Sequence, residues 1–382
     1  MGRFALTNCD VYTGAKVLTD KAIIINQSYI KELTDYDKLT SGIKEIDLKG
    51  MNLAPGFIDL QVNGSDGCLF SNELSLECLE RISKVQNRFG TTNFLVTLLS
   101  GSSERISTST KLVKSSLPKV KGLLGIHFEG PFLNRSKSGI HNLENIVKFS
   151  RNDFPNLAVS DGNLIKLMTL APEEVSTEVI SYLRELGFIL SAGHSDATYE
   201  QAMKAFEEGI TCVTHLFNAM SNFTAREPGL VGAVFDHKSV PASVIVDGHH
   251  SSYASIRIAK KIMKNRLFLV SDGLPSVGSD IKKFTINKRE ITVQEGKCVD
   301  VDGILAGSSI TMSTAIKNSV QKVGISLDEA LRMASTYPAG VLGLGNTLGR
   351  IEPGYKANLA IFDNEINVTG TLIEGEFKEY VS

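Results

Sequence analysis

The stretch LSAGHSDATYEQAMKAFEEGITCVTHLFNAM (residues 190–220) decides how the rest of the chain is interpreted. An apolar run ends on His194, a segment with helical periodicity follows, and a second apolar run ends on His215. This order predicts a strand, a helix and a parallel strand, with a histidine closing each strand. Because the carboxyl ends of parallel strands meet at one edge, the two histidines are expected to share a ligand, most simply a metal ion.

The expected helix within this stretch has its own start and stop signals. Its start is predicted near Ser195 and Asp196, either of which can accept from the free N–H groups of the first turn. Gly209 is expected to end the helix.

Length and composition indicate a globular protein. The 382 residues suit one large barrel with a minor domain, and 42% hydrophobic and 21% charged residues are ordinary for a soluble protein. A net charge of −2 without a basic stripe argues against nucleic acid or an anionic membrane as a partner. The opening residues carry no signal region and no window has the apolar length of a membrane span, so the cytoplasm is the expected location.

The cysteines form an odd and scattered set without CxxC spacing. Neither a disulfide framework nor a zinc knuckle is expected from it, and buried thiols are the simplest interpretation. The five positions are Cys9, Cys68, Cys78, Cys212 and Cys298.

The two ends of the chain differ from its middle. Residues 4–53 alternate in short strands, and the closing segment 348–377 is again strand-like with turn signals. We therefore expect a small discontinuous β-sandwich domain from both termini (1–53 and 340–382) and a catalytic barrel domain at 54–339.

Eight apolar runs occupy the middle, mostly separated by stretches of helical length, and an insertion-like hairpin (284–307) and two helical segments follow them. This alternation predicts an α/β fold, a (β/α)8 TIM-like barrel, with a doubly wound open sheet as the alternative. The runs are 56–62, 92–99, 122–130, 165–172, 187–194, 210–217, 242–249 and 267–273.

A carboxylate accompanies the two histidines. Glu129 ends the third run, where Gly130 and Pro131 break the strand. With His194 and His215 it makes a two-histidine, one-carboxylate set, an arrangement known from catalytic zinc sites that leave a position open for water. Taken alone, Glu129 fits a salt-bridged structural residue equally well, and either histidine alone fits a supporting or core role better.

Four further polar residues stand at strand ends or in loops. Asp272 closes the eighth run and can take a proton from metal-activated water, or can be a turn aspartate before a glycine. His141 follows a polar loop and can polarise a carbonyl or face solvent. Arg226 and His250 are loop cations suited to an anionic group such as phosphate, although each alone is more often a surface charge.

Five motifs, HFEGPFLN, AGHSDAT, THLFNAM, REPGLVG and VSDG, occur in this order. Together they resemble the N-acetylglucosamine-6-phosphate deacetylase family of the amidohydrolase superfamily. The resemblance runs almost end to end and includes PGFID and LGRIEPGYKANLAIF. It implies hydrolysis of the acetamide of N-acetylglucosamine 6-phosphate to glucosamine 6-phosphate and acetate.

The resemblance also implies a role for each site residue. Glu129, His194 and His215 would bind one divalent metal ion, with Zn²⁺ expected first and Fe²⁺, Mn²⁺ or Co²⁺ as alternatives. Asp272 would be the general base and acid, and His141 would contact the acetyl carbonyl.

The remaining implied contacts are with the sugar phosphate. Asn218 and Ala219 would line its site, and Arg226 and His250 would bind the phosphate from a neighbouring subunit. A homodimer is therefore implied.

One departure from the superfamily concerns the first barrel strand. Many amidohydrolases carry His-x-His there, whereas this chain has Gln61-Val62-Asn63, which argues against a fully occupied two-metal centre. A smaller departure is the loop VSDGLPSVG after the eighth run.

Two other functions compete with the deacetylase. A deaminase or cyclic-amide hydrolase could use the same scaffold, but a neutral substrate has no use for the phosphate-binding pair. A catalytically silent assembly protein would have lost ligands or the acid/base residue, and this chain keeps all four.

Overall fold

The computed structural model describes residues 2–152, 154, 157 and 163–380. Its larger part is a barrel of eight parallel strands that follow chain order, so no reversal point of an open doubly wound sheet exists among them. Between the last and first strands, Val62 pairs with Gly273. The expected barrel is confirmed, with strands β6 (Phe57–Val62), β9 (Thr91–Leu99), β10 (Leu123–Glu129), β11 (Ile165–Leu170), β12 (Phe188–Ala192), β13 (Cys212–Val213), β14 (Ala242–Val244) and β15 (Leu267–Leu269).

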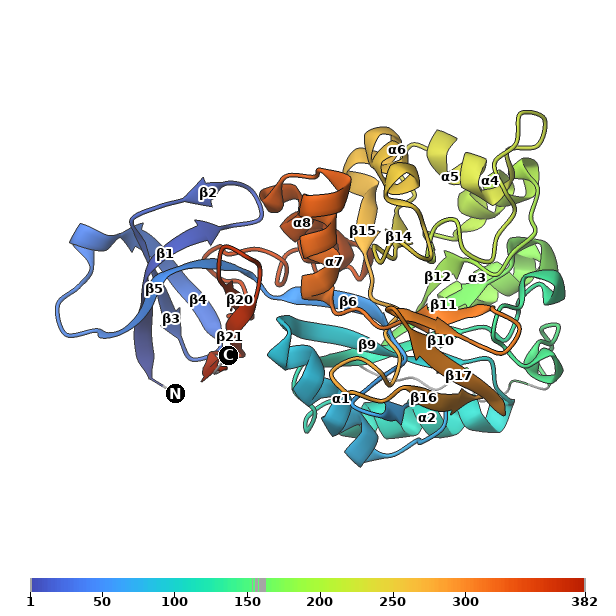
Figure 1. Cartoon of the computed structure of the whole chain (residues 1–382), viewed down its shortest axis with the longest axis horizontal. Coiled ribbons are helices and arrows are strands. Elements are labelled where there is room, and N and C mark those ends of the chain that lie inside the picture. Colours follow the sequence, from blue (N-terminus) through green and yellow to red (C-terminus); the bar gives the residue numbers. More distant parts are fainter. Residues whose placement is uncertain (1, 153, 155–156, 158–162, 381–382) are drawn as a thin grey trace.

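Amphipathic helices cover the outside of the barrel (Figure 1). Helix α1 shows the reason, because Cys78, Leu79 and Ile82 lie on one helical face and are all buried against the strands. The helices are α1 (Leu76–Arg88), α2 (Ser103–Ser116), α3 (Thr177–Glu185), α4 (Tyr199–Glu208), α5 (Gly229–Asp236), α6 (Tyr253–Met263), α7 (Met312–Asn318), α8 (Leu327–Ala334) and α9 (Thr336–Val341), and a short π-helix (Ser319–Val323) follows α7.

Helix α4 starts later than the sequence indicated. Thr198, not Ser195 or Asp196, is the N-cap, and it forms a capping box with Gln201. The hydroxyl of Ser195 instead donates to Glu173 Oε2 at 2.6 Å. The predicted stop is confirmed, since Gly209 is the C-cap with a φ of 123° that favours glycine.

The two termini build the second domain, seen to the left in Figure 1, where β20 from the C-terminal segment pairs with β5 from the N-terminal segment. Hydrogen bonds join its strands into one continuous sheet with an apolar core of its own, so the expected β domain from both termini is confirmed. Its order is β22-β21-β20-β5-β1-β3-β4, with β2 beside β1. The strands are β1 (Arg3–Tyr12), β2 (Val17–Leu18), β3 (Lys21–Asn26), β4 (Tyr29–Asp35), β5 (Lys44–Pro55), β20 (Leu359–Phe362), β21 (Val368–Ile373) and β22 (Glu376–Glu379).

The insertion after β15 is larger than the expected hairpin. It is a four-stranded antiparallel sheet that packs through Ile286, Ile291 and Cys298 on Leu99 and Ile140. Its strands are β16 (Lys283–Ile286), β17 (Arg289–Gln294), β18 (Lys297–Val299) and β19 (Leu305–Ser308). A short hairpin of β7 (Gly64–Ser65) and β8 (Cys68–Leu69) follows β6.

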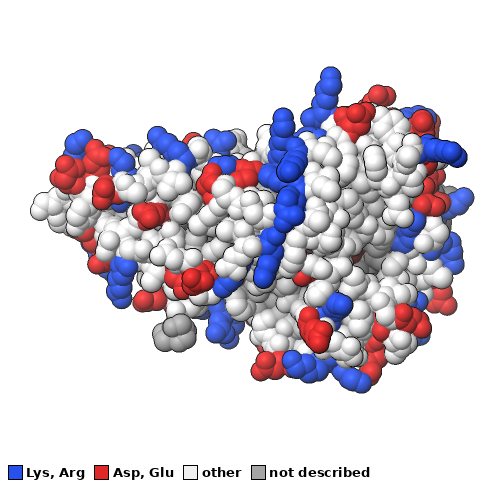
Figure 2. All heavy atoms as spheres, turned by 45° about the horizontal axis from the view of Figure 1, so that its top comes forward, with Lys and Arg blue, Asp and Glu red and all other residues white. Residues whose placement is uncertain are grey.

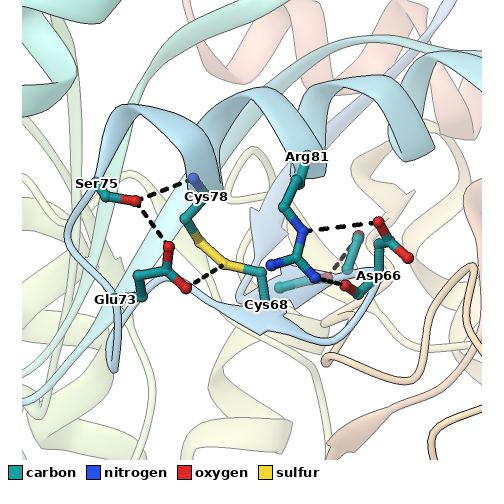
Figure 3. The surroundings of a disulfide bond; sticks show 8 residues. Asp66, Cys68, Glu73, Ser75, Cys78 and Arg81 are labelled. Carbon is teal, nitrogen blue, oxygen red and sulfur yellow. Dashed lines mark hydrogen bonds and ion pairs between the residues drawn. A yellow bond between two sulfur atoms is a disulfide. The ribbon is translucent and has the colours of Figure 1, made fainter.

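One expectation about the cysteines is wrong. Cys68 of β8 and Cys78 in the first turn of α1 form a disulfide, shown in Figure 3 beside Glu73. The ten-residue separation carries no CxxC signal, and only the folding of the β7–β8 hairpin against α1 brings the two sulfurs together. Cys9, Cys212 and Cys298 are buried free thiols, as expected.

Thiol titration of denatured protein, prepared without reductant, is expected to find three free thiols of the five cysteines. Because a disulfide of this loop length constrains the unfolded chain, Cys78→Ser should lower the free energy of unfolding by about 2–3 kcal/mol in denaturant titrations. Cys212→Ser is the comparison that leaves the disulfide intact. Disulfides are rare in a reducing cytosol. A titration that finds five free thiols would contradict this pairing.

The charged side chains of one face are shown in Figure 2. Acidic and basic side chains mix over the face shown in Figure 2, apart from a column of Lys and Arg side chains across its middle. Among the described residues, no helix has the length and apolar character needed to cross a membrane.

Candidate active site

Three predicted metal ligands converge at the carboxyl ends of the barrel strands. Nε2 of His194 and Nε2 of His215 lie 3.1 and 3.0 Å from Oε1 of Glu129, and 3.1 Å from each other. Ligand atoms around a tetrahedral zinc ion at 2.0–2.1 Å are separated by roughly 3.3 Å. The triangle therefore has the dimensions of one metal ion's ligand set.

The tautomer of His194 suits a cation inside this triangle. Its Nδ1 lies 2.8 Å from the carbonyl oxygen of Lys137, which can only accept, so Nδ1 carries the hydrogen. The neutral ring then directs the lone pair of Nε2 at Glu129 Oε1. Two lone pairs facing each other repel, whereas a divalent cation between them turns both into ligands. The residues present fit a divalent metal.

Three residues of the site have a strained backbone conformation that orients their side chains. His194, His215 and Asp272 have φ angles of 49°, 34° and 52°, in the left-handed region that costs a non-glycine residue about 1–2 kcal/mol. Each follows a barrel strand, so the change of backbone direction turns its side chain from the strand axis toward the cavity. Such strain is often found at functional sites.

The electrostatics of Glu129 suit a ligand. Burial opposes its ionisation, but the neighbouring rings of His141, His194 and His215 outweigh burial and hold the pKa of its carboxyl well below the usual range. Burial lowers the pKa of His215, which favours the neutral imidazole that binds metals.

His141 also lies beside Glu129, but as a hydrogen donor. Its Nε2 is 3.7 Å from Oε2 of Glu129, and the donor atoms of Glu129, His141 and His194 all lie within 4.8 Å of one another. However, the backbone N–H of Ser100 donates to Nδ1 of His141 at 3.2 Å. The hydrogen of the neutral ring is therefore on Nε2, which makes His141 a donor rather than a metal ligand.

Asp272 is buried at the same edge of the barrel. Its Oδ1 accepts a hydrogen bond of 2.7 Å from Nδ2 of Asn63. Burial, and after it the negative charge of Glu129, raise the pKa of Asp272 well above its usual range. A carboxyl in this environment can hold a proton and release it again.

The two amides of the first strand support this site. Nε2 of Gln61 donates to Oε1 of Glu129 at 3.0 Å, as Asn63 donates to Asp272. Their carbonyl oxygens, Gln61 Oε1 and Asn63 Oδ1, are buried without a hydrogen-bond partner in the described part of the chain. The two amides therefore hold the carboxylates of Glu129 and Asp272 in place.

Glu129, His141, His194, His215 and Asp272 line a cavity of about 310 Å³, a size suited to a small ligand. Asn218, Ala219 and His250 line it too. The remaining wall residues come from the loop after β10 and from the β16–β19 insertion. They include Ser136, Lys137, Gly139, Ile140, Ile304, Leu305, Ala306 and Gly307.

The two predicted phosphate ligands are separated. His250 lines the cavity of its own chain. Arg226 is exposed in the loop before α5, and it is not among the described residues that line this cavity. The sequence could not distinguish them, because both follow barrel strands in polar loops.

Asp247 is a site residue that the sequence reasoning missed. Its Oδ2 accepts from Nδ1 of His250 at 2.6 Å, and its Oδ1 accepts from the backbone N–H groups of His249 and His250. Asp247 fixes the ring of His250 and leaves Nε2 as its other polar atom. The strand-end rule that identified Asp272 would have found Asp247 after the run ASVIV.

Comparisons with known proteins agree with this geometry. A model of the amidohydrolase family matches residues 52–378, and one of the NagA composite domain matches residues 3–53. The N-acetylglucosamine-6-phosphate deacetylase of Haemophilus influenzae is 41% identical over 99% of this chain and 100% of its own length.

Solved structures show the same likeness. The crystal structure of N-acetylglucosamine-6-phosphate deacetylase from Pasteurella multocida superposes with a TM-score of 0.96 at 39% identity, covering 99% of this chain and 100% of that one. A variant of the deacetylase from Mycobacterium smegmatis, in complex with N-acetyl-D-glucosamine-6-phosphate, has a TM-score of 0.91 at 26% identity and covers 99% of both chains.

Proposed function

Because the chain belongs to the amidohydrolase family, and within it to the N-acetylglucosamine-6-phosphate deacetylases, we propose that it hydrolyses the acetamide of N-acetylglucosamine 6-phosphate. The products are glucosamine 6-phosphate and acetate. The observation that carries the proposal is the convergence of Glu129, His194 and His215 within 3.0–3.1 Å beside His141 and Asp272 in one cavity.

Glu129, His194 and His215 hold one divalent metal ion in this proposal. Two imidazole nitrogens and one carboxylate oxygen suit Zn²⁺ first, and also Fe²⁺, Mn²⁺ and Co²⁺. When bound, the ion polarises the acetyl carbonyl and lowers the pKa of the attacking water. Gln61 and Asn63 offer only carboxamides to a second ion, which are poorer ligands than imidazole for such metals.

His141 orients the acetyl group. The N–H of Ser100 occupies its Nδ1, so its Nε2–H is free to donate to the acetyl carbonyl oxygen. That oxygen gains negative charge as water attacks, and a donor already in place stabilises the charge without reorganisation.

Asp272 moves the proton. Its carboxylate takes a proton from the water that attacks the acetyl carbon, and the carboxylic acid then gives the proton to the amine nitrogen as the C–N bond breaks. Its raised pKa favours the protonated form between these two events.

The phosphate is bound by His250 of the same chain and by Arg226 of a neighbouring subunit in a homodimer. Asp247 orients the ring of His250 toward this role. Arg226 is exposed in its own chain, as a residue that serves another subunit would be.

Replacing either cation should weaken the binding of the phosphorylated sugar. Arg226→Ala or His250→Ala is expected to raise KM about 10- to 100-fold, since each removes a charge-assisted hydrogen bond worth roughly 1.5–3 kcal/mol. Lys31→Ala, which removes an exposed charge from the terminal sheet, should leave KM unchanged. Equal use of N-acetylglucosamine and its 6-phosphate by the wild type would contradict the phosphate contacts.

Mixed dimers test which subunit supplies Arg226. Co-expressed Arg226→Ala and Asp272→Asn chains form mixed dimers with one site that has both Asp272 and the partner's Arg226. Low KM should return in the mixture if Arg226 acts across the interface. Sedimentation as a monomer at assay concentration would contradict the dimer.

A further inference from the structure

The barrel closes at an irregular seam between β15 and β6. Strand β15 pairs with β14 over three residue pairs, but Val62 and Gly273 form an isolated bridge across the seam. The backbone N–H groups of Asn63 and Gly64 both donate to the carbonyl oxygen of Gly273. In the described part of the chain, the backbone hydrogen bonds between the two strands therefore lie near the cavity, next to Asp272.

Asp59 fills the seam below these bonds. Its fully buried carboxylate accepts from the backbone N–H of Ser271 at 3.2 Å and from the Ser271 hydroxyl at 2.5 Å. It also accepts from the backbone N–H of Gln61 at 3.1 Å. No Lys, Arg or His of the described chain forms an ion pair with it. Burial of an unpaired carboxylate costs free energy, and at Asp59 hydrogen bonds from Ser271 and Gln61 offset this cost without an ion pair.

The two residues that donate to Asp59, Ser271 and Gln61, are each connected to a residue of the candidate active site. Ser271 precedes Asp272, whose positive φ must be enforced by its neighbours. Ser308 also bonds to this segment. Its Oγ donates to the carbonyl oxygen of Ser271, and its backbone N–H donates to the carbonyl oxygen of Asp272. Gln61 donates from its side chain to Glu129.

We propose that Asp59 is a positioning residue for the hydrolysis, because it holds Ser271 and Gln61 so that Asp272 and Glu129 face one cavity. This inference rests on the proposed function. Asp59 is not among the described residues that line the cavity, so it acts through Asp272 and not on the substrate.

The protonation of Asp59 agrees with this role. Burial raises its pKa to about 6, against hydrogen bonds from Ser271 and Gln61 that lower it. At the slightly alkaline pH of an ordinary assay the group is a carboxylate and can accept all of these hydrogen bonds.

Asp59→Asn keeps the shape but places an NH2 group where an acceptor is needed. We expect kcat to fall about 10- to 100-fold, because displacement of a reacting group by fractions of an ångström has such effects. KM should stay within about threefold, since the sugar contacts are untouched. Metal content per chain and the folded fraction at the assay temperature should match those of the wild type.

Two further variants separate positioning from packing. Ser271→Ala removes the hydroxyl donor but keeps the backbone donor, so a smaller loss of kcat, about 3- to 10-fold, is expected. Thr97→Val is the matched control, because Thr97 is buried in the same barrel and its hydroxyl has no partner among the described residues. Its kcat should be unchanged.

The outcomes distinguish this inference from the proposed function. Asp59→Asn with a kcat within twofold of wild type, or with a loss that tracks only folded fraction or metal content, overturns the positioning role. If Asp59→Asn does not fold, Ser271→Ala decides, and an unchanged kcat there has the same meaning. Absence of acetate release by wild-type protein overturns the proposed function, and the positioning role with it.

Discussion

Asp272→Asn is expected to lower kcat by about a hundredfold or more while the protein stays folded and keeps its metal. The carboxamide can still accept from Nδ2 of Asn63, which donates to Oδ1 in the wild type. It cannot take up a proton from water or return one to the amine nitrogen. The loss should therefore appear in kcat, with little change in KM.

Asp280→Asn is the matched control, because Asp280 is an exposed aspartate in the loop that follows Asp272. Its kcat should equal that of the wild type. Turnover by Asp272→Asn within a few-fold of the wild type, in protein with unchanged metal content, would remove Asp272 from the mechanism.

Glu129→Gln is expected to lose both the metal and the activity. Oε1 of Glu129 is the atom within about 3 Å of both histidine nitrogens, so the carboxylate supplies the negative charge of the ligand set. A neutral carboxamide oxygen is a much weaker ligand for zinc-like ions. Elemental analysis should fall from about one metal per chain toward zero.

Glu144→Gln, in an exposed turn after His141, is the control that should keep the metal. Two results would contradict this account of the site. One is two tightly bound ions per chain at full activity, and the other is an active enzyme without metal.

Strand ends were the part of the site that the sequence could predict. Glu129, His194, His215 and Asp272 each stand where an apolar run stops, and parallel strands place such positions at one edge of the barrel. Asp247 also stands where an apolar run stops, but the sequence analysis assigned the role at this position to the nearby His250.

Other features depend on contacts that no local pattern records. Helix α4 begins after Thr198 and not near Ser195, because the Ser195 hydroxyl donates a hydrogen bond to Glu173, which is distant in sequence. The Cys68–Cys78 disulfide requires the β7–β8 hairpin to lie against α1.

The role proposed for Asp59 illustrates the same limit. In sequence it is one polar residue within PGFIDLQV, and its partner Ser271 is 212 positions away. Closure of the barrel brings the two together, so the hydrogen bonds follow from the topology of the whole domain.

Acetate release from N-acetylglucosamine 6-phosphate, measured on protein of known metal content, tests the central claim most directly. The account predicts catalytic release that scales with a metal content approaching one ion per chain and is lost on chelation, with N-acetylglucosamine a poor substrate. Metal-loaded, folded protein that releases no acetate from the phosphorylated sugar would contradict it.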